Sequence, residues 1–103
     1  MTQSRFALEA DPRQQPPVLM VTGEIDLANV GEFEKSMVLA GAGAPAVTID
    51  LTGVSYCDSA AVRALFSMAA STALTLVVGP TGHIKTLLSI SGLDRVATVV
   101  VED

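Results

Sequence analysis

Residues 46–69 read AVTIDLTGVSYCDSAAVRALFSMA, and this stretch decides the fold. Residues 46–51 predict a strand, and residues 52–57 predict a short irregular link. A helix is then expected to begin at Asp58-Ser59, because apolar residues recur beyond it at the spacing i, i+3, i+4 and i+7. The residues at that spacing, which we expect to face the core, are Val62, Leu65, Phe66 and Ala69. The pattern indicates a strand–helix unit of an α/β protein.

The same alternation extends on both sides of this unit. Upstream, residues 5–10 and 18–22 predict strands, and residues 19–21 form an unbroken apolar run that is typical of strands covered on both faces. A helix follows, for which Asn29 is the expected N-cap and Glu32 completes a capping box. Its expected apolar stripe is Val30, Phe33, Met37 and Val38.

Downstream, residues 74–78 predict a buried strand and residues 96–101 a final β-branched strand. Between them a helix is expected to end at Ser91-Gly92, with its inner face formed by Ile84, Leu87, Leu88 and Ser91. The order is β-β-α-β-α-β-α-β, which predicts an α/β fold with a mostly parallel or mixed sheet. A chain of 103 residues has room for one core, so we predict a single domain over residues 1–103 with its core at about 6–101.

The charge balance excludes several classes of partner. Eleven acidic residues face six lysines and arginines, which makes the net charge −5. Nucleic-acid binding and attachment to an anionic membrane are therefore not expected, whereas a protein partner is. The N-terminal residues lack the apolar core of a signal peptide, and the lone Cys57 excludes an internal disulfide. Together these features predict a soluble cytoplasmic protein.

Enzymatic chemistry finds little support in the residues. His83 is the only histidine and precedes a predicted helix, where a solvated residue is the commoner case. Residues 79–86 resemble a phosphate-binding loop only loosely, because the spacing and the Gly-Lys-Thr/Ser ending are missing. Cys57 is interpreted as a small buried apolar residue rather than a redox sensor. We therefore expect no catalytic residue, no metal and no cofactor.

Two carboxylates are more informative. Asp26 follows one predicted strand, and Asp58 opens the helix after the next one. If the two strands are neighbours, both residues lie at one edge of the sheet, where sites of α/β proteins gather. The simpler interpretation is that Asp58 or Ser59 only caps the helix.

Three short segments resemble the STAS domains of the anti-sigma factor antagonist family. The G-E-h-D motif of that family (h is an apolar residue) is similar to Gly23-Glu24-Ile25-Asp26, and its D-L-S…D-S segment to residues 50–62. The family ending P…L…S-G-L is similar to Pro80, Leu87 or Leu88, and Ser91-Gly92-Leu93. The segments occur in the family's order, and the resemblance covers about residues 6–101.

The resemblance implies a four- or five-stranded mixed sheet with helices mainly on one face, and a switch. In bacterial antagonists the serine that matches Ser59 is phosphorylated by the partner anti-sigma factor, a histidine-kinase-like serine kinase. The unphosphorylated form binds this partner, which frees the sigma factor for transcription in a stress response; a serine phosphatase resets the cycle. The residues implied around the phosphorylated serine are Gly23, Glu24, Asp26, Asp58, Ala60, Ala61 and Arg63.

One residue departs from the family pattern, and the family offers a second role. Ala61 stands where the family has glycine, so its methyl is expected at the surface that a partner loop approaches. The alternative role within the same family is an adaptor that does not switch, as a subunit of a lipid-transport ATPase or of a stress-sensing assembly. In either role the chain is expected to be a monomer or weak dimer without enzymatic activity.

Overall fold

The computed structural model describes residues 5–9, 17–42, 44–80 and 82–102. Strands and helices alternate along these residues in the order predicted from the sequence. The elements are β1 (Arg5–Glu9), β2 (Val18–Ile25), α1 (Val30–Gly41), β3 (Ala46–Cys57), α2 (Ser59–Ala69), β4 (Ala73–Val78), α3 (His83–Ser91), the short 3₁₀ helix η1 (Leu93–Arg95) and β5 (Thr98–Val101).

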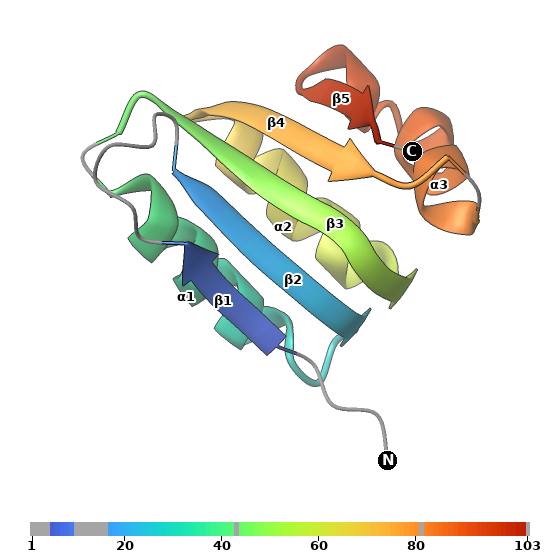
Figure 1. The fold of residues 1–103 in the computed structure, drawn as a ribbon, viewed down its shortest axis with the longest axis horizontal. Coiled ribbons are helices and arrows are strands. Elements are labelled where there is room, and N and C mark those ends of the chain that lie inside the picture. The colour runs from blue at the N-terminus through green and yellow to red at the C-terminus, as the bar shows by residue number, and fades with distance from the viewer. Residues whose placement is uncertain (1–4, 10–16, 43, 81, 103) are drawn as a thin grey trace.

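The strands form one mixed sheet in the order β1-β2-β3-β4-β5. β1 is antiparallel to β2, and β2 to β5 run parallel, because each parallel pair is joined by a helix that crosses back over the sheet. Figure 1 shows that α1, α2 and α3 lie on the same face of the sheet. The predicted α/β class, with a mixed sheet covered mainly on one face, is confirmed.

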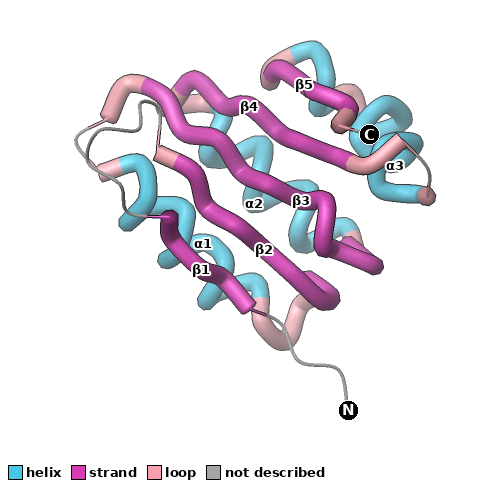
Figure 2. The backbone as a smooth tube through the Cα atoms, viewed as in Figure 1, coloured by secondary structure: helices cyan, strands magenta, loops and turns pink. Residues whose placement is uncertain are grey.

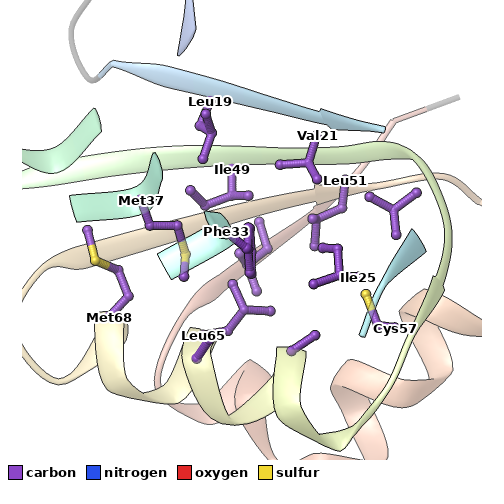
Figure 3. Packing of buried hydrophobic residues seen from close by; sticks show 14 of the residues in the cluster. Leu19, Val21, Ile25, Phe33, Met37, Ile49, Leu51, Cys57, Leu65 and Met68 are labelled. Atoms are coloured by element: carbon purple, nitrogen blue, oxygen red, sulfur yellow. The ribbon is translucent and has the colours of Figure 1, made fainter. Parts of the chain in front are cut away.

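The core lies between the sheet and the helices. In Figure 3, Phe33 of α1 lies between Ile49 on the sheet and Leu65 on α2, and all three side chains are at most 1% exposed. The opposite face of the sheet carries no helix in the described structure (Figure 1). Met20 is consequently 37% exposed, so the inference that residues 19–21 are covered on both faces was wrong.

The predicted link at residues 52–57 is also wrong, because β3 continues to Cys57. These residues pair with the end of β2, with register shifts between Met20 and Thr22 and between Gly23 and Glu24. Gly53 allows the close approach: a Cβ there would lie 2.8 Å from Thr22 Cγ2. The glycine that suggests a link in the sequence is what lets two irregular strands stay paired.

Helix α2 is rotated from its predicted orientation. Leu65 is buried as expected, but Val62, Phe66 and Ala69 are only half-buried and lie at the flank. The residues that face the sheet are Ala61, Ala64, Leu65 and Met68. Small side chains at two of these positions let the helix backbone pack closely against the sheet. A similar correction applies to α1, where Val38 is 62% exposed and Ala40 is buried.

Candidate functional site

The C-terminal ends of β2 and β3 lie side by side. Ile25 and Cys57 are register partners, and the Asp58 N–H donates to the Ile25 carbonyl at 3.2 Å. Asp26 and Asp58 are the next residues on the two strands, so they meet at one edge of the sheet. The juxtaposition expected from the sequence is confirmed.

Asp58 joins two backbone segments through its carboxylate. Oδ1 accepts from the N–H groups of Ala60 at 2.9 Å and Ala61 at 3.2 Å, which caps the N-terminus of α2. Oδ2 accepts from the N–H of Leu27 at 3.1 Å, in the loop after β2. The helix cap and the link between the two strand ends are therefore functions of one side chain.

The loop after β2 is held by a second set of hydrogen bonds. Asp26 Oδ1 accepts from the Ala28 N–H at 2.9 Å. The Asp26 N–H donates to Asn29 Oδ1 at 2.9 Å, and Asn29 Nδ2 donates to the Glu24 carbonyl at 2.8 Å. Asn29 is the N-cap residue of α1, but its side chain makes no cap hydrogen bond, so the predicted capping box is wrong. The asparagine stabilises the loop instead.

The candidate residues differ in their access to a partner. Ser59 is exposed at the first position of α2, and Arg63 is exposed one turn later. Ala60 is half-buried, whereas Ala61 is fully buried and turns its methyl toward the core. The expected obstruction of a partner by Ala61 therefore has no basis in the fold.

Gly23 and Glu24 lie near the C-terminal end of β2, just before the loop that carries Asp26. Gly23 has φ +90°, a value that L side chains rarely adopt, and its carbonyl accepts from Ser55 Oγ at 3.3 Å. Both residues are half-buried. Gly23 is thus needed for the irregular course of β2 into the loop that carries Asp26.

Two exposed side chains with apolar surface lie at this edge, and sequence reasoning missed one of them, Leu27. Leu27 is 77% exposed although its N–H is held by Asp58, and Tyr56 is 45% exposed. The ring centroids of Tyr56 and His83 lie 6.2 Å apart. An apolar residue directly after the Gly-Glu-Ile-Asp motif, in a loop, was the signal available in the sequence for Leu27.

Cys57 lies just inside the edge and is 7% exposed. Burial, and to a lesser extent the neighbouring Asp58 charge, raises the pKa of its thiol to about 12. The thiolate is the reactive form of cysteine, so a thiol held protonated at neutral pH is inert. This environment supports the interpretation of Cys57 as a buried apolar residue.

Within the described ranges, no three His, Cys, Asp or Glu side chains are grouped so that they could hold a metal ion. No helix among the described residues is long and apolar enough to cross a membrane. What the edge does offer is an exposed hydroxyl at a capped helix start, two carboxylates and an exposed leucine.

The fold and this edge define a small α/β domain with a surface suited to protein recognition. The family model described as "Mlab, STAS domain" matches residues 8–102. The chain therefore belongs to the STAS domain family, as its three sequence segments indicate. The comparison with curated protein sequences found no match.

Solved structures share the fold at low sequence identity. An anti-sigma factor antagonist from Mycobacterium paratuberculosis is 22% identical with a TM-score of 0.81, over 95% of this chain and 86% of that one. The unphosphorylated anti-sigma factor antagonist SpoIIAA is 20% identical with a TM-score of 0.71, over 95% and 90%. A DUF3478-family protein from Shewanella loihica with a SpoIIAA-like fold is 9% identical with a TM-score of 0.61, over 100% and 88%. At these identities the likeness establishes the fold alone.

Proposed function

We propose that this STAS domain is an anti-sigma factor antagonist of the bacterial cytoplasm that is switched by phosphorylation of Ser59. Unphosphorylated, it binds an anti-sigma factor serine kinase and so regulates sigma-factor-dependent transcription; phosphorylated, it is released until a serine phosphatase restores it. The observation that carries the proposal is the position of Ser59. It is exposed at the first residue of α2 and directly follows Asp58, whose carboxylate bonds both the start of α2 and the loop after β2.

A phosphate on Ser59 would add negative charge at the edge that already carries Asp26 and Asp58. It adds about −1.5 to −2 charges at neutral pH. The N–H groups of Ala60 and Ala61 already bind Asp58 Oδ1, so these two donors are occupied when the phosphate arrives. The added charge therefore stays at the exposed surface beside Asp58. There it lowers the affinity for a partner whose surface fits a neutral hydroxyl.

The same geometry predicts that the fold survives modification. Ser59 is exposed, so a phosphate need not displace core side chains, and the helix macrodipole favours negative charge at this end. Arg63 lies four residues on, at the spacing of neighbours on a helix surface, and can pair with the phosphate. The switch thus acts on partner affinity and leaves the domain folded.

The second candidate function is a STAS adaptor that does not switch, as a subunit of a transporter ATPase or a stress-sensing complex. The family model that matches residues 8–102 is described as "Mlab, STAS domain", and this description fits an adaptor as well as an antagonist. In an adaptor the same edge would hold a constant partner and Ser59 would serve only as the first residue of a helix.

The test compares binding by calorimetry for four forms: the wild type, its phosphorylated form, Ser59→Ala and Ser59→Asp. The partner is the protein recovered from lysate of the source cells with the tagged wild type. We expect Ser59→Ala to bind like the wild type, the phosphorylated form to lose binding, and Ser59→Asp to lose it in part, since aspartate carries less charge than phosphate. Ser67→Ala, an exposed serine on the same helix, is the matched control and should bind normally.

Phosphorylation itself is followed by intact mass and fragment mass spectrometry. With the partner kinase and ATP, phosphate should appear on Ser59 in the wild type and in Ser67→Ala, and be absent from Ser59→Ala. The domain alone with ATP should show no turnover and no self-phosphorylation. Equal binding by all four forms would support the adaptor and reject the switch.

A further inference from the structure

Leu27 is an exposed apolar side chain on a loop whose backbone is fixed. The loop joins the end of β2 to the start of α1, and Figure 2 shows it as a short connection at the edge where β3 also ends. Leu27 is 77% exposed, so its side chain adds little to the core. The contacts that hold this loop therefore place the leucine at the surface without burying it.

Hydrogen bonds fix the backbone on both sides of this leucine. Its own N–H donates to Asp58 Oδ2 at 3.1 Å, and the next N–H, that of Ala28, donates to Asp26 Oδ1 at 2.9 Å. The Asp26 carbonyl accepts from the N–H groups of Asn29 at 3.1 Å and Val30 at 2.9 Å. A side chain presented from a backbone that is already ordered loses less conformational entropy on binding.

Two other large apolar side chains of similar exposure lie on helices. Leu39 on α1 is 70% exposed, and Ile90 on α3 is 80% exposed. At those positions the hydrogen bonds of the helix itself order the backbone. At Leu27, two aspartate side chains order the backbone instead, and one of them comes from a distant segment. An ordered loop that presents an apolar side chain is suited to anchor a protein partner.

The carboxylates that hold the loop also border Leu27 with negative charge. Asp26 precedes the leucine in the chain, and Asp58 accepts from its N–H. A carboxylate can accept at up to about four sites, so both can also receive hydrogen bonds from a partner. Arg63 lies one turn into α2 and forms no ion pair with either aspartate among the described residues. An apolar side chain between two carboxylates is complementary to an apolar pocket with a basic rim.

We propose that Leu27 is the apolar anchor of the partner surface around Ser59. It inserts into an apolar pocket of the anti-sigma factor, and lysine or arginine side chains at the rim of that pocket face Asp26 and Asp58. The hydrogen bond from Leu27 to Asp58 places the anchor beside the residue that precedes Ser59, so one partner contacts both. The inference rests on the proposed function, from which it takes the partner, and it adds the pocket and the charges that this partner must have.

Calorimetry with the partner protein recovered in the Ser59 experiment tests the anchor. Leu27→Ser should raise the dissociation constant at least about tenfold, because the pocket loses its apolar side chain. Leu27→Met keeps an apolar side chain of similar volume and should bind nearly as the wild type does. Leu39→Ser, at a leucine of similar exposure on α1, is the matched control and should bind normally. All three variants should unfold near the wild-type temperature, since substitutions of exposed side chains change stability little.

The basic rim is tested separately, by stopped-flow measurement of association at several salt concentrations. Asp26→Asn removes the charge, while its side-chain oxygen can still accept from the Ala28 N–H. The association rate constant should fall and depend less on salt, because charges at the rim of an interface act mainly on encounter. Glu34→Gln, at an exposed residue within α1, is the control and should keep the wild-type rate. An unchanged rate for Asp26→Asn would overturn the basic rim.

Alkylation of a cysteine placed at the anchor gives a direct footprint of the partner. Iodoacetamide should react readily with Leu27→Cys in the free chain and slowly in the complex. The reaction of Leu39→Cys should have the same rate in both. The native Cys57 is buried and does not compete for the reagent.

The outcomes separate the anchor from the switch. Normal binding by Leu27→Ser, together with loss of binding on phosphorylation, would overturn the anchor and leave the switch intact. Weak binding by Leu27→Ser, with equal binding by all four forms compared for Ser59, would support the anchor in an adaptor and reject the switch. Equal losses in Leu27→Ser and Leu39→Ser, or alkylation of Leu27→Cys that the partner does not slow, would overturn the anchor. A dimer of this chain that Leu27→Ser dissociates, without effect on the partner, would overturn it as well.

Discussion

Replacing Asp58 tests whether one carboxylate both caps α2 and holds the loop after β2. Asp58→Ala removes the cap acceptor for Ala60 and Ala61, a loss of about 0.5–2 kcal/mol, and the acceptor for Leu27, about 0.5–1.5 kcal/mol. The Leu27 bond is exposed, so water replaces it in part and its share lies at the lower end. The sum is roughly 1–3 kcal/mol.

Asp58→Asn separates the two functions. Its carbonyl oxygen can still accept from Ala60 and Ala61, but its amide cannot accept from the Leu27 N–H. The asparagine variant should therefore lose about 0.5–1 kcal/mol, and the alanine variant more. Each kcal/mol lowers the Tm of a domain of this size by about 4–8 °C, which makes the two variants distinguishable in thermal unfolding.

Amide hydrogen exchange gives a readout that stability alone does not. Exchange at Leu27 should accelerate in both variants, whereas exchange at Ala60 and Ala61 should accelerate only in Asp58→Ala. Glu34→Ala, which removes an exposed carboxylate within α1, is the control and should change the free energy of unfolding by less than about 0.5 kcal/mol. If Asp58→Ala has the same free energy of unfolding as Glu34→Ala, or if exchange at Leu27 is unchanged, Asp58 does not hold both the helix start and the loop.

Two further predictions concern the core. Leu65→Ala should lower the free energy of unfolding in denaturant by about 2–5 kcal/mol, because Leu65 is 1% exposed. Val62→Ala, at a half-buried residue, should lower it by about 1 kcal/mol. Equal losses would mean that α2 has the orientation predicted from its sequence stripe. The pKa of the Cys57 thiol is about 12 in the folded state against 9.0 as the reference, so the unfolded state loses its proton first as pH rises. The free energy of unfolding should be unaffected by this group below pH 9 and fall by up to about 1.4 kcal/mol per pH unit above it. Cys57→Ala should lack that part of the pH dependence, and identical slopes for the two proteins between pH 8 and 10.5 would contradict the burial argument.

The comparison of sequence and structure is clearest around residues 46–69. Hydrophobic spacing places a strand and a helix there, and Gly92 marks the end of α3, where it adopts φ +82°. Such signals are local, because an amphipathic stripe or a left-handed glycine depends only on the residues within a turn or two. The placement of Asp26 and Asp58 at one edge needed only the added assumption that their strands are neighbours.

Three features depended on contacts between segments far apart in the chain. β3 continues through residues 52–57 because β2 supplies its partner, although its own residues resemble a link. α2 turns Ala61 and Ala64 toward the sheet, where their small side chains allow close packing, and leaves part of its bulkier stripe at the flank. The bond from Leu27 to Asp58 joins residues 31 positions apart, and no local pattern encodes it. The amino-acid sequence by itself therefore determined the elements, their order and the meeting of Asp26 and Asp58 at one edge. The strand register, the rotation of α2 and the hydrogen bond from Leu27 to Asp58 were decided by packing, since their energies arise only when distant segments meet.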